Sequence, residues 1–209
     1  MVKEISITLP QRRPYQFVRQ FKITLLETDP PVWRRIQVPE YYTFYELHVA
    51  IQDAMGWLDS HLHDFKIRPL RRACLGIRIE SPFALDDLEE EAPLLTTEVA
   101  VADFIKEPGD RALYTYDYGD DWQHDVLFEG SHPRERGKKY PTCVAGELAG
   151  PPEDCGGIPG YYDCVKALRE SDNSEGLLDW LGRWRPDRFD PTRIKFWSPL
   201  RRLKLALGE

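Results

Sequence analysis

The chain has 209 residues, of which 42% are hydrophobic and 12% aromatic, so it holds enough apolar side chains for a packed core. It contains no run of the roughly 18 apolar residues that a membrane span needs, and its first residues lack the layout of a signal peptide, which predicts a cytoplasmic protein with no membrane partner. The net charge of -7 argues against non-specific nucleic-acid binding by the protein as a whole, and four cysteines without CxxC spacing are expected to stay reduced.

Three strands are predicted in the first third of the chain. Apolar residues alternate with polar ones over residues 15–25 and again over residues 32–38, and the prolines of the turn between them favour a hairpin. Residues 60–67 alternate less regularly but are still typical of a strand.

A helix is predicted between the second and third strands, over residues 44–55. Thr43 is a suitable N-cap, and Glu46 stands three residues later, as in a capping box. Gly56 follows where the helix would end. Strand, strand, helix and strand in this order indicate an α+β fold, an α/β roll whose part over residues 15–82 is β-grasp-like.

The rest of the chain is expected to complete one domain over residues 1–209. The acidic segment 83–98 is predicted to be a solvated loop, because repulsion among its acids disfavours compact packing. The part over residues 99–209 would supply a short helix, a second hairpin and C-terminal helices. The expected elements are a helix within 97–106, strands 111–117 and 122–128 joined by the turn 118–121, helices near 161–169 and 174–181, and a last helix after residue 191.

The segment Pro151-Pro152-Glu153-Asp154-Cys155-Gly156-Gly157 predicts a rigid loop. Its prolines remove backbone donors and its glycines allow backbone angles that other residues avoid. Glu153 and Asp154 would cap the backbone donors of the glycine turn and of the following helix, or pair with Arg34 and Arg35, and this clamping role is favoured over catalysis by these acids. Cys155 would be a nucleophile if the following helix lowered the pKa of its thiol, but packing is the commoner role of such a cysteine.

Four strings in the sequence resemble those of one known family. They are Pro31-Val32-Trp33-Arg34-Arg35, Gly56-Trp57 with His61-Leu62-His63-Asp64-Phe65, Tyr116-Asp117-Tyr118-Gly119-Asp120-Asp121-Trp122-Gln123-His124, and the loop 151–157 with Gly160-Tyr161. In this order they resemble the plasmid pRiA4b ORF-3-like family over roughly residues 15–198.

The resemblance implies a compact α+β fold, found in bacteria and archaea and often encoded on plasmids or beside transposable elements. It implies no particular reaction. Members of the family often carry a further cysteine directly before the Pro-Pro-Glu-Asp string, where this chain has Gly150. That departure weakens any proposal of a cysteine-rich metal site.

The favoured interpretation is a binding or interaction protein whose partner is an unidentified small molecule or protein. Aromatic walls with a few polar groups are typical of ligand sites. The residues expected to converge on such a pocket are Trp57, His61, His63, Asp117, Asp120, Trp122, His124, Glu153 and Asp154.

A metal-dependent hydrolase or nuclease is the alternative. His61, His63 and His124 would bind zinc or manganese, and Asp120 or Glu153 would be the general base. Against this stands the simpler interpretation that the histidines make hydrogen bonds or fill the core and that the acids stabilise a turn.

A second alternative is nucleic-acid binding through the basic, aromatic C-terminal segment. The cations assigned to it are Arg193, Lys195, Arg201 and Arg202. The competing interpretation is that the aromatic residues of this segment belong to the core and that its cations form a solvated rim.

Overall fold

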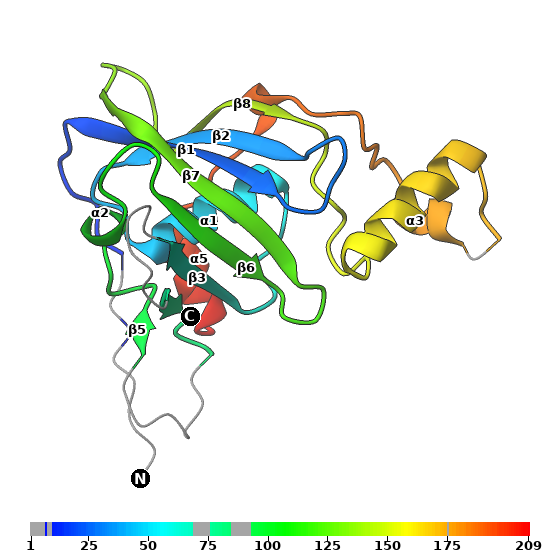
Figure 1. Cartoon of the computed structure of the whole chain (residues 1–209), viewed down its shortest axis with the longest axis horizontal. Helices are drawn as coiled ribbons and strands as arrows, with labels where there is room; N and C mark the ends of the chain where they lie inside the picture. The colour runs from blue at the N-terminus through cyan, green and yellow to red at the C-terminus, as the bar shows by residue number, and fades with distance from the viewer. Residues whose placement is uncertain (1–6, 8–9, 69–75, 85–92, 175) are drawn as a thin grey trace, which may run out of the picture.

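The computed structural model describes residues 7, 10–68, 76–84, 93–174 and 176–209, and it has an α+β fold. Its described strands form one sheet in the order β5-β4-β3-β6-β7-β1-β2-β8 (Figure 1). Neighbouring strands are antiparallel except β4 and β5, which are parallel. The strands are β1 Phe17–Leu25, β2 Trp33–Pro39, β3 His63–Arg68, β4 Ile77–Glu80, β5 Leu94–Leu95, β6 Arg111–Tyr116, β7 Trp122–Pro133 and β8 Thr142–Glu147.

The helices lie behind and beside this sheet. α1 crosses one face of the sheet, α5 lies near α1, and α3 with α4 stands to one side (Figure 1). Among the described residues, no helix combines the length and the apolar character needed to cross a bilayer. The helices are α1 Phe44–Met55, α2 Val101–Phe104, α3 Gly157–Glu170, α4 Leu177–Leu181, the 3₁₀ turn η1 Pro191–Arg193 and α5 Pro199–Ala206.

α1 is embedded in the protein. The predicted capping box is present, since the Thr43 side chain accepts from the Glu46 amide and the Glu46 carboxylate accepts from the Thr43 amide, and Gly56 ends the helix in the left-handed conformation. Every residue of α1 except Asp53 is buried, because the sheet covers one side and α5 packs on the other. The helix therefore carries its polar side chains into the core, where their hydrogen bonds must be satisfied internally.

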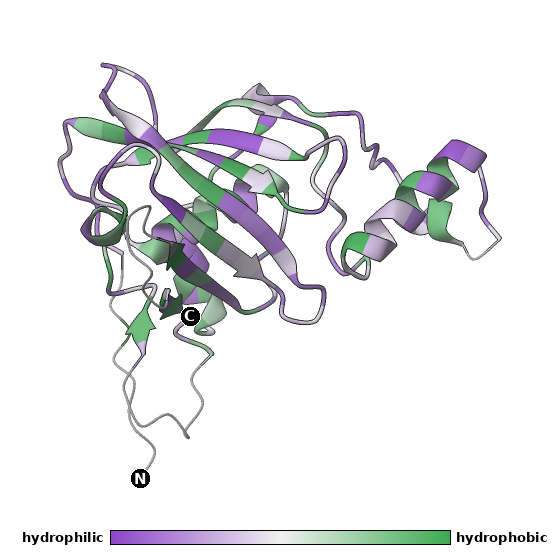
Figure 2. Cartoon of the chain, in the orientation of Figure 1, coloured by the Kyte–Doolittle hydropathy of each residue, from purple (hydrophilic) through white to green (hydrophobic). Residues whose placement is uncertain are grey.

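The predicted order of strand, strand, helix and strand is confirmed, and so is the second hairpin, β6 and β7. This hairpin lies between β3 and β1, so the two predicted parts of the chain share one sheet. Along β1 and β7 the colours of Figure 2 alternate, because one face of these strands covers α1 and the other faces outward.

The strands β4, β5 and β8 were not predicted from the sequence. β8 contains a glycine and a β-bulge opposite β2, and most of its residues are partly exposed, so no clean alternation marks it. β5 lies within the segment predicted as a solvated loop, but the acid-rich residues 86–91 of that segment are outside the described residues.

Candidate functional site

The loop 151–157 is fastened to the end of the sheet by direct hydrogen bonds. The Glu153 carboxylate accepts from the Leu58 amide at 2.7 Å and from the Tyr116 hydroxyl. The Trp57 indole donates to the Pro151 carbonyl at 3.0 Å and stacks on Tyr116 with 5.1 Å between ring centroids. Glu153 therefore fastens the loop to Leu58 and Tyr116 and not to the backbone donors of the glycine turn.

The partners of this clamp differ from the predicted arginines. Arg34 is buried and donates to the carbonyls of Ala54 at 2.8 Å and Glu147 at 2.9 Å, whereas Arg35 pairs with Glu129 at 2.7 Å. Neighbouring residues of a strand point to opposite faces, so the two arginines cannot serve one loop together.

His61 lies against the clamped loop, between two aspartates. Its Nε2 is 2.7 Å from Asp154 Oδ1 and 3.5 Å from Asp117 Oδ2. Both aspartates adopt left-handed backbone angles, with φ of 59° at Asp154 and 56° at Asp117. Partial burial disfavours the imidazolium, but the hydrogen bond that His61 donates to Asp154 and the charges of Asp117, Asp154 and Glu153 outweigh it and raise the pKa of His61.

Asp120 ties the β6–β7 turn to the same loop. Its carboxylate accepts from the Gly156 amide at 3.1 Å, and Asp117 accepts from the Gly119 amide at 2.9 Å within the turn. A Cβ atom on Gly157 would stand 2.6 Å from the Asp120 carbonyl oxygen. The close approach of turn and loop therefore requires glycine at this position.

A second polar cluster lies deeper, between α1 and β3. The rings of His48 and His63 stack with 3.5 Å between centroids and 9° between planes. His48 Nε2 is 2.6 Å from Asp59 Oδ1, and His48 Nδ1 is 2.7 Å from the Tyr114 hydroxyl. Burial and the neighbouring His48 hold the pKa of His63 well below its ordinary value, so His63 is neutral.

The stacked rings oppose a metal ion shared by His48 and His63. One ring nitrogen from each of His48 and His63 and one carboxylate oxygen of Asp59 do lie within 4.8 Å of one another. However, the lone pair of an imidazole nitrogen lies in the ring plane, and two nearly parallel rings 3.5 Å apart cannot both direct a lone pair at one ion. This cluster is better suited to hydrogen bonding.

A cavity of about 420 Å³ opens beside this cluster, and we call it the histidine pocket. It is lined by Tyr45, Asp59, Ser60, His61, Leu62, His63, Ser81, Phe83 and Ala206. Two polar atoms of the lining residues, the Tyr45 hydroxyl and His63 Nδ1, are buried without a hydrogen-bond partner. Such atoms cost free energy unless water or a ligand satisfies them.

The remaining predicted pocket residues belong to the core. Trp122 and His124 are fully buried, and the His124 ring packs edge-on against Trp57 with 5.3 Å between centroids. Burial lowers the pKa of His124 to about 3. The nine residues expected to share one pocket are thus divided among the loop contacts, the histidine pocket and the core.

The three histidines proposed as metal ligands do not meet. Both His61 and His63 line the histidine pocket, but His61 clusters with Asp117 and Asp154 and His63 with His48 and Asp59, while His124 belongs to neither cluster. β6 lies between β3 and β7, so its tyrosines Tyr114 and Tyr116 separate His63 from His124.

The surroundings of Cys155 do not favour the thiolate that a nucleophile needs. Burial first, and then the neighbouring Cys164 and Asp120, raise the pKa of its thiol to about 12. Among the residues that the structure describes, no cysteine belongs to a cluster able to hold a metal ion.

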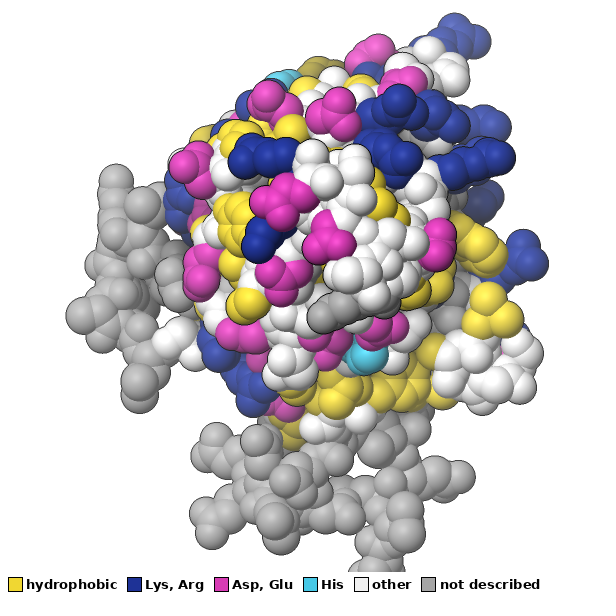
Figure 3. Space-filling model, turned by 90° about the vertical axis from the view of Figure 1, so that its right-hand side faces the viewer, with side chains coloured by type: hydrophobic (Ala, Val, Ile, Leu, Met, Phe, Trp, Pro, Cys, Tyr) yellow, Lys and Arg dark blue, Asp and Glu magenta, His cyan; other side chains and the backbone are white. Residues whose placement is uncertain are grey.

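The predicted C-terminal cations are not all free to contact a partner. Arg202 is used structurally, because it pairs with Asp53 at 2.5 Å and donates to the Leu58 carbonyl at 2.8 Å. Arg201 lies 5.3 Å over the Trp197 ring, Lys195 lies near Trp197 beside a cavity at α5, and Arg193 is in η1. Figure 3 shows Lys and Arg side chains gathered toward one edge of the face that it displays, while acids lie across its centre.

Tyr45 and Asp59 were not predicted as site residues. The signal in the sequence is a pair of polar residues, His48 and Gln52, that lie one helical turn apart in the predicted helix. Both bond to the Tyr114 hydroxyl, and Gln52 also accepts from the Asp59 amide at 3.0 Å.

Comparisons with known proteins agree with the sequence strings. A family model described as plasmid pRiA4b ORF-3-like protein matches residues 18–193. The uncharacterised protein y4hQ of Sinorhizobium fredii is 31% identical over 169 residues, which are 79% of this chain and 81% of that protein. The crystal structure of a protein of unknown function, MM3350 from Methanosarcina mazei, is 37% identical with a TM-score of 0.76, and the match covers 88% of this chain and 100% of that one.

Proposed function

The chain belongs to the plasmid pRiA4b ORF-3-like family, and we propose that it is a binding protein that holds a small amine-bearing molecule in the histidine pocket. The observation that carries this proposal is the pair of buried, unpartnered polar atoms, the Tyr45 hydroxyl and His63 Nδ1, among the residues lining a cavity of ligand size. A bound molecule would satisfy atoms that the fold leaves without partners.

The chemistry of the pocket wall favours a cation with an apolar portion. The Asp59 carboxylate accepts charged donors, and the Tyr45 hydroxyl accepts or donates. Neutral His63 offers a further nitrogen without adding positive charge. The rings of Tyr45 and Phe83 give an aromatic wall, against which an aliphatic chain or an ammonium group packs favourably.

A thermal-shift screen tests this proposal with small alkyl and aromatic amines against carboxylates of matched size, followed by calorimetry on any amine that raises Tm. Tyr45→Phe should weaken amine binding by about tenfold while leaving the protein as stable or more stable, because the lost hydroxyl has no partner in the protein. A structural hydroxyl would instead lose stability on the same change.

Tyr118→Phe is the matched control, since Tyr118 lies outside the pocket, on the β6–β7 turn. Asp59→Asn should weaken amine binding by tenfold or more. The proposal fails if no amine stabilises the protein, or if Tyr45→Phe and Tyr118→Phe bind a stabilising amine equally well.

A divalent-metal centre at His61, Asp117 and Asp154 is a second candidate function. One ligand atom from each of these residues lies within 4.8 Å of the others, and the carboxylates that raise the pKa of His61 would also attract a metal cation. Zinc or manganese suits one imidazole and two carboxylates. Glu153 and Asp120, proposed as general bases, already accept the hydrogen bonds that hold the loop to its neighbours, so the described contacts support metal binding more than hydrolysis.

Elemental analysis of protein purified without an affinity tag, followed by zinc and manganese titration, tests this centre. His61→Ala should abolish metal stabilisation, whereas His132→Ala, which changes an exposed histidine on β7, should not. Less than about a tenth of an equivalent of metal, with no rise in Tm on adding either ion, would remove the metal centre from consideration.

A further inference from the structure

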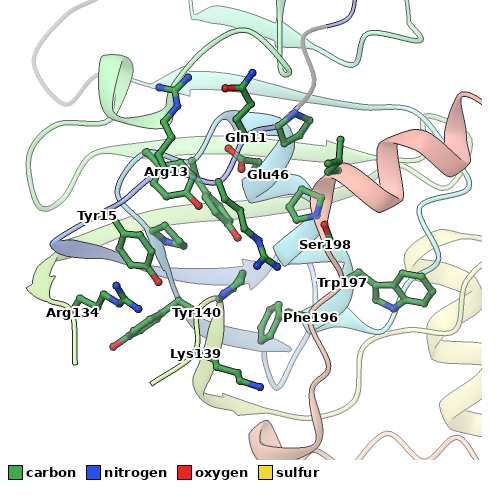
Figure 4. Close-up of a pocket in the computed structure, with 18 of the residues that line it drawn as sticks. Gln11, Arg13, Tyr15, Glu46, Arg134, Lys139, Tyr140, Phe196, Trp197 and Ser198 are labelled. Atoms are coloured by element: carbon green, nitrogen blue, oxygen red, sulfur yellow. The ribbon is translucent and has the colours of Figure 1, made fainter. Parts of the chain in front are cut away.

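A larger cavity, of about 1030 Å³, lies apart from the histidine pocket, and we call it the basic groove. It runs between the N-terminal arm 10–15, the β7–β8 connection 134–141 and the segment 194–200 that leads into α5 (Figure 4). These three segments are far apart in the sequence, so the groove could not be predicted from the sequence. Its cations are Arg12, Arg13, Arg134, Lys138 and Lys139.

The groove gathers five cations, although the net charge of the whole protein is -7. Among the described residues that line it, Glu46 is the one carboxylate. Glu46 is committed to the capping box of α1, and burial raises its pKa to about 7. Lys138 pairs with Glu135 at 2.9 Å, but the other cations of the groove make no comparable ion pair among the described residues. An anionic partner would therefore gain several uncompensated cations.

Aromatic rings stand among these cations, and they are Tyr15, Tyr41, Tyr42, Tyr140, Phe196 and Trp197. Tyr15 contacts Tyr41 and Tyr140 edge-on, with 5.7 and 6.4 Å between ring centroids. Arg134 lies 4.6 Å over Tyr15, and Lys138 lies 5.5 Å over Tyr140. Figure 4 shows Tyr15, Arg134 and Tyr140 on one side of the groove and Phe196 with Trp197 on the other.

We propose that the basic groove binds single-stranded nucleic acid, with phosphates on the cations and bases stacked on the partly exposed rings. Proteins that bind single-stranded nucleic acid without sequence preference place cations along its phosphate backbone and stack aromatic side chains on its bases. A duplex hides its base faces, so the rings would have nothing to stack on. An acidic peptide would use the cations but would leave the aromatic rings without partners.

The proposal changes which residues carry nucleic-acid binding. Phe196 and Trp197 belong to the C-terminal segment identified in the sequence, but the cations come from the N-terminal arm and the β7–β8 connection. Arg202, assigned to nucleic acid from the sequence, is instead bonded to Asp53 and Leu58.

Fluorescence anisotropy with labelled twelve-nucleotide DNA and RNA tests the proposal at several salt concentrations. The double variant Arg134→Glu with Lys139→Glu changes two exposed groove cations. It should weaken binding at least tenfold in 50 mM salt and reduce the slope of log affinity against log salt by about 1.4, because each single-strand phosphate contact contributes about 0.7. The matched control, Lys166→Glu with Arg169→Glu on α3, makes the same charge change away from the groove and should leave affinity within twofold.

Stacking is tested separately. Tyr140→Leu keeps every charge and should weaken binding of the oligonucleotide about fivefold or more, but should not weaken binding of an abasic strand of equal length. Far-UV circular dichroism checks that each variant is folded. Equal losses in the two charge-reversal doubles, a duplex or polyglutamate bound as tightly as the single strand, or no binding at 100 µM protein would each overturn the proposal.

Discussion

Replacing His124 with leucine should remove a large part of the sensitivity of this protein to acid. His124 is buried among Trp57, Tyr114 and Trp122, and its pKa in the folded state is about 3. In the unfolded chain the pKa of a histidine is about 6.5. Below pH 6.5 the unfolded state therefore takes up a proton that the folded state does not, and the free energy of unfolding falls with pH.

The size of this effect follows from the two pKa values. A histidine with a pKa of about 6.5 unfolded and about 3 folded lowers the free energy of unfolding by about 2 kcal/mol between pH 8 and pH 5. Because pH 5 lies well above the folded pKa, the result depends mainly on the unfolded value. The contribution is fully present above pH 6.5 and is lost as pH falls toward 3.

Urea unfolding followed by tryptophan fluorescence, at pH 8 and pH 5, measures the difference. The wild type should lose about 2 kcal/mol more than His124→Leu over this interval. His63, with a lowered pKa, and His61, with a raised pKa, contribute equally to both proteins and cancel. His132→Leu is the matched control because His132 is exposed. The reasoning is refuted if wild type and His124→Leu lose the same stability within about 0.5 kcal/mol.

Three further predictions concern the clamped loop. A double-mutant cycle of Glu153→Ala and Tyr116→Phe, measured by urea unfolding, should give a coupling energy of about 1–2 kcal/mol, whereas additive losses would mean that this hydrogen bond contributes nothing. Gly160→Ala should cost about 3 kcal/mol in the same assay, because its Cβ would stand 1.7 Å from the Cys155 carbonyl oxygen, and a loss below 1 kcal/mol would contradict this contact. His61→Gln should be less stable than wild type at pH 5.5, by less than about 1 kcal/mol, and equally stable at pH 9. The reason is that a raised histidine pKa stabilises the fold below pH 6.5, and this stabilisation is lost as pH rises through the folded pKa. Thermal unfolding in which the variant is less stable at pH 9 but not at pH 5.5 would contradict the raised pKa of His61.

The first half of the fold could be predicted because its signals are local. The α1 boundaries follow from Thr43, Glu46 and Gly56, whose capping roles are set within a few residues of the chain. β8 could not be predicted, because its residues are held by pairing with β2 roughly a hundred positions earlier and not by their own alternation.

The candidate site shows the same limit. The left-handed backbone angles at Gly156 and Gly157 could be predicted from the sequence of the loop 151–157. Its partners Leu58 and Tyr116 could not, because they depend on how β6 meets the end of α1. His61, His63 and His124 look equivalent in the sequence. Their different depths in the fold make one a partner of acids, one a pocket wall and one a core residue.

The pairing of β1 with β7 has a consequence for how the protein is made. Leu25 lies opposite His124, so these two interior strands of the sheet are paired across roughly a hundred intervening residues. During synthesis the β1–β2 hairpin leaves the ribosome long before β7 does, and one edge of β1 stays unpaired in the meantime. Folding of this chain should therefore be limited by closure of a long loop, and a nascent chain stalled before residue 122 should be captured by chaperones that bind exposed strands.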